Sequence, residues 1–88
     1  MRHASHPEIL TRLKRAEGHL RSIIAMIAEE RSCLDIAQQL HAVEAAVANA
    51  KKLLIHDHIE HCLDDAMSEG TLDGVGAMRE LKTLAKYL

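Results

Sequence analysis

The sequence contains no Phe and no Trp, and Tyr87 is its single aromatic residue. Proteins that bind RNA or single-stranded DNA by stacking use aromatic rings as platforms for the bases. The composition therefore excludes a platform of that kind. The sequence also has one Pro, Pro7, and four Gly, which argues against a β-rich fold and favours long helices.

Long apolar runs are absent too. No run approaches the ~20 residues that a membrane-spanning helix needs, and the N-terminal residues lack the apolar segment of a signal peptide. We therefore expect a cytoplasmic protein with no membrane partner. In that compartment the two cysteines are expected to be free thiols, metal ligands or redox sensors rather than a structural disulfide.

The usual signatures of an enzyme are missing as well. There is no Gly-rich phosphate loop and no nucleophile accompanied by a base and an orienting residue, so we expect no catalysis and no organic cofactor. The 88 residues, 48% of them apolar, form one expected domain spanning 1–88. A chain this short buries little apolar surface alone, so oligomerisation is expected.

Charge is unevenly distributed along the chain. The net charge is −2, yet basic residues dominate from Arg2 to Arg21, whereas Asp57 to Asp73 carries acids and no Lys or Arg. The first stretch could meet a polyanion and the second could not.

Apolar residues recur at alternating steps of four and three in two stretches, which predicts two amphipathic helices. The first set is Ile9, Leu13, Ala16, Leu20, Ile23 and Ile27. The second set is Ile36, Leu40, Val43, Val47, Ala50 and Leu54. The second helix is expected from about Cys33 to about Met67, capped by Ser32 with Asp35 at its third position. A loop is expected over 68–76, followed by a short helix from about Ala77 to Lys86.

These patterns predict an all-α fold with three helices and no helix-turn-helix, because no short turn separates two suitable helices. The second helix would be ~50 Å long, which is more than a small globule can cover. A partner chain is the natural cover, and small residues around Ala46 permit close helix crossing. We expect an antiparallel helical-bundle dimer.

Three residues carry the chemistry: Cys33, His58 and Cys62. At ~100° per residue they share one face of the second helix, but Cys33 and His58 lie ~37 Å apart along its axis. They cannot meet within one chain. In an antiparallel dimer, Cys33 of one chain faces His58 and Cys62 of the other, which creates two identical sites. Two thiolates and an imidazole suit Cu(I), Zn(II), Ni(II) or Co(II).

The other histidines are less directly placed. His3 and His6 are expected on a short N-terminal arm that could supply a further metal ligand. His56 and His61 are expected to point away from the His58 face. His19 and His41 are expected to be structural or exposed.

Three stretches resemble the CsoR/RcnR family of small all-α transcriptional repressors. They are Arg12-Leu13-Lys14-Arg15 with Gly18-His19-Leu20, then Cys33-Leu34-Asp35-Ile36 with Gln39 and Ala42-Val43, and finally His56-Asp57-His58-Ile59-Glu60-His61-Cys62.

The resemblance implies a dimer of dimers, a homotetramer, that binds double-stranded operator DNA when empty and releases it when an inducer binds. The genes released from repression would be metal efflux genes. It places the inducer at Cys33, His58 and Cys62, with Glu80 of the third helix expected beside these ligands and not itself bound to the metal. It places DNA contacts on basic residues of the first helix and the middle of the second. These are Arg12, Lys14, Arg15, Lys51 and Lys52.

The inducer stays open between Ni(II) or Co(II) and Cu(I). Nickel and cobalt sensors of the family add an N-terminal histidine, for which His3 is available and His6 is the alternative. Copper sensors carry a Tyr just before the first cysteine, where this chain has Ser32. Two alternatives are a thiol-based sensor of formaldehyde or persulfide on the same scaffold and a structural helical adaptor.

Overall fold

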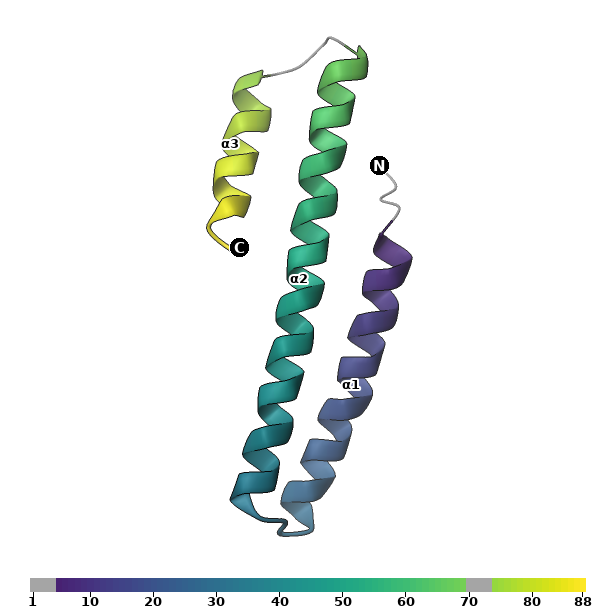
Figure 1. Ribbon diagram of the computed structural model, residues 1–88, viewed down its shortest axis with the longest axis vertical. Coiled ribbons are helices and arrows are strands. Elements are labelled where there is room, and N and C mark those ends of the chain that lie inside the picture. Colours follow the sequence, from purple (N-terminus) through teal and green to yellow (C-terminus); the bar gives the residue numbers. More distant parts are fainter. Residues whose placement is uncertain (1–4, 70–73) are drawn as a thin grey trace.

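The described part of the chain is made of three helices and contains no strand, so the all-α prediction is confirmed. A computed structural model describes residues 5–69 and 74–88, without the side chains of 62–75 and 77. The helices are α1 (His6–Ala28), α2 (Cys33–Glu69) and α3 (Gly74–Ala85). Helices α1 and α3 pack on opposite sides of the long α2, and both run antiparallel to it (Figure 1). None of the described helices has an apolar stretch that could cross a membrane.

Helix α1 begins at His6, a residue that the sequence analysis expected on an N-terminal arm. Ser5 is its N-cap residue and Pro7 stands in its first turn, where a missing N–H costs nothing. His6 is therefore the first helical residue and not part of an arm, which corrects its expected position. The Ser5 side chain makes no capping hydrogen bond.

The turn between α1 and α2 is a Schellman motif. The N–H of Glu30 donates to the Ile27 carbonyl, and the N–H of Arg31 donates to the Met26 carbonyl. Glu30 adopts a φ of 57°, the left-handed conformation that glycine favours at this position. Ser32 then caps α2 as predicted, because its Oγ accepts a hydrogen bond from the Asp35 N–H at 3.1 Å.

The connection to α3 differs from the prediction. Ser68 and Glu69 belong to α2, and α3 begins at Gly74 rather than near Ala77. Glycine costs ~1 kcal/mol in a helix interior, whereas Gly74 and Gly76 lie in the first turn of α3. The rest of the expected loop, 70–73, lies outside the described residues.

The core of one chain buries alternate members of the predicted α1 stripe, whereas on α2 it buries one stripe member, Ala50, and Ile55 beside the stripe. Ile9, Ala16 and Ile23 are buried at seven-residue intervals on α1, and Ala50 and Ile55 are buried on α2. The alternate members of the α1 stripe stay exposed. These are Leu13, Leu20 and Ile27. The radius of gyration is 18.0 Å, against about 12 Å for a compact chain of this length, so the chain is too elongated to cover both positions of its heptads.

Candidate functional site

The predicted metal ligands lie at opposite ends of α2. Cys33 is the first residue of the helix and an exposed free thiol. Helix α2 runs without a break past His58, which fixes the two residues ~37 Å apart. The side chain of Cys62 lies outside the described part. Among the described side chains no three His, Cys, Asp or Glu residues form a metal-binding group, so a site using Cys33 and His58 requires two chains.

His58 is held at the junction of α2 and α3. Its Nε2 lies 2.9 Å from Glu80 Oε1, and the imidazole is half-buried while Glu80 is exposed. The contact crosses between the two helices and fixes the ring orientation. This is the arrangement by which a carboxylate orients a metal-binding histidine.

His6 lies at the same place. A pocket of about 220 Å³ is lined by His6 from α1, Leu54, Ile55 and His58 from α2, and Glu80 and Leu84 from α3. The N-terminal end of α1 therefore approaches the His58–Glu80 contact within one chain. His3 lies outside the described residues.

The remaining histidines have separate roles. His61 Nε2 lies 3.6 Å from Asp57 Oδ1 one turn earlier on α2, and Asp57 is buried. His19 of α1 donates from Nε2 to Gln39 Oε1 of α2, which joins the two helices. His41 is exposed.

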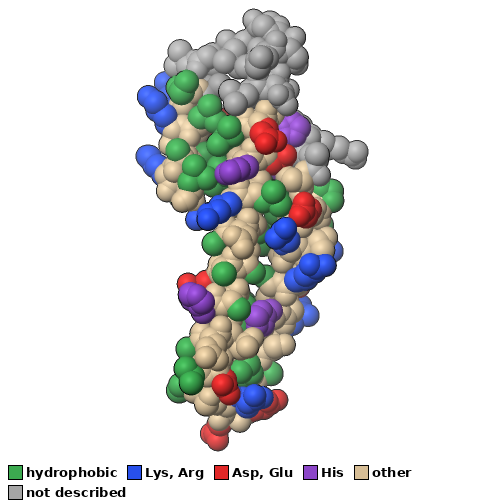
Figure 2. Space-filling model, viewed as in Figure 1, with side chains coloured by type: hydrophobic (Ala, Val, Ile, Leu, Met, Phe, Trp, Pro, Cys, Tyr) green, Lys and Arg blue, Asp and Glu red, His purple; other side chains and the backbone are tan. Residues whose placement is uncertain are grey.

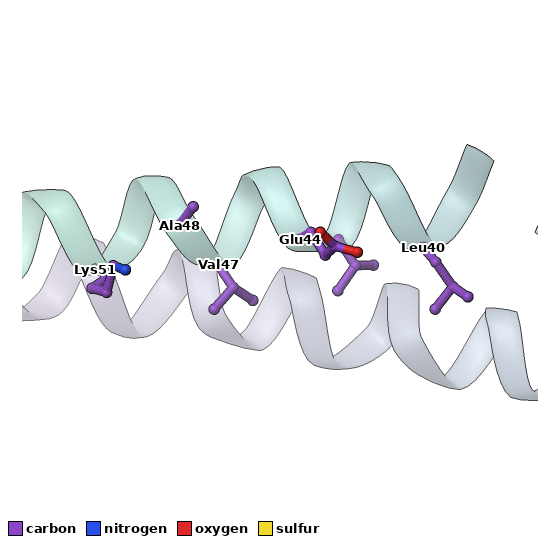
Figure 3. A pocket seen from close by; sticks show the side chains of 6 residues that line it. Leu40, Glu44, Val47, Ala48 and Lys51 are labelled. Carbon is purple, nitrogen blue, oxygen red and sulfur yellow. The ribbon is translucent and has the colours of Figure 1, made fainter. Parts of the chain in front are cut away.

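An apolar groove follows the middle of α2. It has a volume of about 480 Å³, and Figure 3 shows its side chains on successive turns of the helix. Its lining residues are Leu40, Val43, Glu44, Val47, Ala48 and Lys51. The apolar members belong to the face predicted to meet a partner chain.

The predicted DNA-binding residues divide between different surfaces. Arg12 and Lys52 line one pocket between α1 and α2. Lys51 instead lines the apolar groove, which also contains Glu44. Lys14 and Arg15 are exposed on α1. On the face shown in Figure 2, Lys and Arg side chains gather over the N-terminal half of α1, and acidic side chains lie at the end where α1 turns into α2.

The pocket that contains Arg12 and Lys52 also holds two residues that the sequence analysis did not place there. Asn49 and His56 line it, together with Leu53, in a volume of about 350 Å³. Asn49, Lys52 and His56 are spaced by three and four residues, which puts them on one helix face. That spacing is visible in the sequence, but the position of α1 beside it is not.

Comparison with known proteins identifies the family. The metal-sensitive transcriptional repressor family matches residues 5–87. The copper-sensing transcriptional repressor CsoR of Bacillus subtilis (strain 168) is 43% identical over 79 residues, which cover 90% of this chain and 76% of that protein. The CsoR of Mycobacterium tuberculosis (strain H37Rv) is 33% identical over 78 residues, and the match spans 89% of this chain and 64% of that protein.

Two solved structures share the fold across nearly the whole chain. The nickel-responsive transcriptional regulator InrS superposes with a TM-score of 0.83 at 30% identity, covering 100% of this chain and 98% of that chain. The copper-sensing repressor CsoR with Cu(I) from Geobacillus thermodenitrificans NG80-2 superposes with a TM-score of 0.82 at 34% identity, covering 98% of this chain and 88% of that chain. The chain belongs to the CsoR/RcnR family of metal-sensing transcriptional repressors.

Proposed function

We propose that this repressor binds operator DNA when metal-free and releases it when Ni(II), Co(II) or Cu(I) binds between two chains, which derepresses metal efflux genes. The ligands are Cys33 of one chain with His58 and Cys62 of the other. The observation that carries the proposal is the unbroken α2 helix. It separates Cys33 from His58 within a chain, so the two residues could meet only between two antiparallel chains related by a two-fold axis.

The exposed surface supports the pairing. The chain exposes 6810 Å², whereas a folded monomer of its 9.8 kDa mass exposes about 5,200 Å². The apolar groove on α2 offers a surface for a second copy. Glu44 and Lys51 lie on either side of Val47 in that groove, so a two-fold axis near Val47 sets each charge close to its opposite on the other chain. The same pairing brings Cys33 to the His58 end of the partner helix.

The chemistry of the donor set fits a transition metal ion. When bound, such an ion supplies a Lewis-acid centre that draws soft thiolates and imidazole together. Cys33 is exposed and accessible for coordination. A proton on His58 Nε2, donated to Glu80 at 2.9 Å, would leave the lone pair of Nδ1 available to a metal ion.

Two observations favour Ni(II) or Co(II) over Cu(I). His6 lines the pocket of His58 and offers a nitrogen donor beyond the three predicted ligands, and Ni(II) and Co(II) accept more ligands than Cu(I). Copper sensors of the family carry a Tyr just before the first cysteine, whereas this chain has Ser32 there, and its hydroxyl caps α2. The known relatives include sensors of both kinds, copper-sensing CsoR and nickel-responsive InrS.

DNA binding requires cations that meet phosphates. The exposed basic residues of α1 and Lys52 of α2 provide them, whereas Lys51 lines the groove proposed for the partner chain, so operator affinity is expected to fall steeply with salt. Release follows from a population shift: ligation across the dimer favours a tetramer conformation whose basic residues match the phosphates less well.

Complementation between two inactive variants tests the shared site. Cys33→Ala and His58→Ala proteins each lack a ligand in every site. Mixed and refolded together, they form heterodimers in which one of the two sites has its Cys33 from one chain and its His58 and Cys62 from the other. We expect metal binding at half a site per chain in the heterodimer and none in either parent. No recovery in the mixture would contradict the intersubunit site.

Anaerobic titration identifies the inducer. Reduced protein is titrated with Ni(II), Co(II) and Cu(I), and the thiolate-to-metal absorption and release of DNA are recorded. Bands with Ni(II) or Co(II) that disappear in His6→Ala protein would establish a nickel or cobalt sensor using His6. Tight Cu(I) binding that is indifferent to His6 and releases DNA would establish a copper sensor. If no metal releases DNA, the proposal that a metal ion is the inducer is wrong. Formaldehyde and persulfide are then tested as inducers.

A further inference from the structure

The pocket between α1 and α2 has the composition of an anion site. Arg12 reaches it from α1, and Asn49, Lys52, Leu53 and His56 line it from α2. The four polar side chains are all exposed, so the pocket is open to a ligand from solvent. Each of them can donate a hydrogen bond, and none of the described residues that line the pocket is a carboxylate. A ligand rich in acceptor oxygens and negatively charged fits this set.

A phosphate group meets those requirements best. The Arg12 guanidinium offers a planar fork to two oxygens, and Lys52 supplies a second, compact positive charge. Asn49 and His56 stand one turn on either side of Lys52 along α2, so their N–H groups flank it. The imidazole donates from a protonated ring nitrogen even when neutral.

One carboxylate competes for the Arg12 guanidinium. Glu8 Oε1 lies 3.0 Å from Arg12 Nη2 and accepts a hydrogen bond from Arg12 Nε at 3.3 Å. Both side chains are about half exposed, at 46% and 57%. Solvent screens the attraction between two exposed charges, so the ion pair is weak. An incoming phosphate can therefore replace Glu8 as the partner of the guanidinium.

We propose that this pocket binds one phosphate of the operator backbone, with Asn49 and His56 as ligands beside Arg12 and Lys52, and with Glu8 as an internal competitor for Arg12. The inference rests on the proposed function, because it takes operator DNA as the ligand. It adds two ligands and a competitor to the basic residues already assigned to DNA. It also separates Lys52, which lies in the pocket, from Lys51, which lies in the apolar groove.

The test uses full-length metal-free protein and a duplex that this protein selects from a random-sequence library. Failure to select any duplex would count against the proposed function itself. With a selected duplex, binding is measured by fluorescence anisotropy over a range of salt concentrations. Circular dichroism and the thermal midpoint establish that each variant is folded.

Loss of either neutral donor is the first comparison. Asn49→Ala and His56→Ala are each expected to weaken binding by about three- to tenfold, because one hydrogen bond to a charged oxygen is lost. His56→Gln keeps an N–H donor and should recover part of the loss. The matched controls are Gln38→Ala and His41→Ala, an exposed amide and an exposed imidazole elsewhere on α2. Asn49→Ala should leave the salt dependence unchanged, since no charge is removed.

Release of Arg12 from its competitor is the second comparison. Glu8→Gln is expected to raise the affinity for the duplex. Its control is Glu17→Gln, which removes the same charge from α1 and breaks a pair of the same spacing with Arg21 at 3.6 Å. A gain that is larger for Glu8→Gln than for Glu17→Gln supports the pocket. Equal gains would show a general charge effect and overturn the role of Glu8.

A titration with inorganic phosphate tests whether the pocket binds a phosphate of the DNA backbone or a free phosphate ion. Labelled protein is titrated with phosphate against chloride at equal ionic strength, and the Asn49 and His56 side-chain resonances are followed by NMR. If phosphate saturates the pocket while the Asn49 and His56 variants bind the duplex like their controls, the pocket serves a free anion and the operator assignment is overturned. If the variants bind both the duplex and phosphate like the controls, the site itself is refuted.

Discussion

His58 Nε2 and Glu80 Oε1 lie 2.9 Å apart, and they join α3 to the part of α2 that carries the proposed metal ligand His58. The contact sets the orientation of the imidazole and selects the nitrogen that can coordinate. It also makes α3 part of the site, although α3 contributes no predicted metal ligand. A change at Glu80 should therefore be felt at the metal.

Glu80→Gln is expected to weaken metal binding by about 10- to 100-fold, which is the usual effect of removing an orienting partner from a metal-bound histidine. The measurement is competition with a chromophoric chelator of known affinity. Glu17→Gln removes the same charge far from the site and should leave the metal affinity unchanged. Equal affinities for the Glu80 variant and wild type would show that the contact does not serve the metal.

The turn after α1 offers a stabilising substitution. Glu30 holds a φ of 57° where glycine is unstrained, so Glu30→Gly is expected to raise the free energy of unfolding by about 0.5–1 kcal/mol. Glu29 next to it has a φ of −85°, and Glu29→Gly should instead lower the free energy of unfolding by up to about 1 kcal/mol. Urea unfolding at one fixed protein concentration measures both. The same sign for both variants would contradict the role of the left-handed residue.

The hydrogen bond from His19 to Gln39 links α1 to α2 and should contribute to the stability of the pair. His19→Ala and Gln39→Ala are each expected to lower the free energy of unfolding by about 1 kcal/mol, and a double-mutant cycle should give a coupling of about 0.5–1.5 kcal/mol. His41→Ala, at an exposed position on α2, is the control. Strictly additive effects of the two substitutions would show that the contact is energetically silent.

Periodicity predicted the fold because each long helix has a heptad stripe, with Pro7 in the first turn of α1 and Ser32 capping α2. The spacing of Cys33 and His58 on one helix also showed that neither could complete a site alone, and the unbroken α2 agrees with that reasoning. The heptad pattern could not show which half of each stripe packs within the chain. Ile23 is buried and Ile27 is exposed, although both follow the same pattern.

The sequence could not predict features that depend on how the helices pack against each other. Glu30 adopts a conformation that its residue type does not favour, and nothing local announces it. His6 was expected on an arm, but it is the first residue of α1 and lies beside the pocket of His58. The approach of Arg12 to Asn49 and His56 depends on the packing of α1 along α2.

The proposed metal site and the proposed phosphate pocket use different faces of the same turns of α2. His58 lines a pocket with Glu80 of α3 and His6 at the start of α1, while His56 lines the pocket that contains Arg12 of α1, and the two residues are separated by ~200° around the helix. A rotation or shift of these turns that suits metal ligation therefore moves His56 relative to Arg12. We therefore expect metal and operator DNA to be coupled through α2. Coupling of this kind is reciprocal, so saturating operator DNA must weaken metal binding by the factor by which metal weakens DNA binding, about 5- to 150-fold.

Metal affinity is measured by chelator competition with and without the selected duplex, and DNA affinity is measured with and without metal. Cys33→Ala is the control, because it should bind DNA with an affinity that added metal does not change. His56→Ala should lower DNA affinity and also reduce the coupling factor, since the residue that transmits the shift to the phosphate is gone.

If metal affinity is identical with and without the duplex while metal still releases DNA, the two measurements would violate linkage, and release would have to come from a process other than binding at this site. If His56→Ala weakens DNA binding but leaves the coupling factor intact, the shift reaches the DNA through other residues, and the basic side chains of α1 become the next to test.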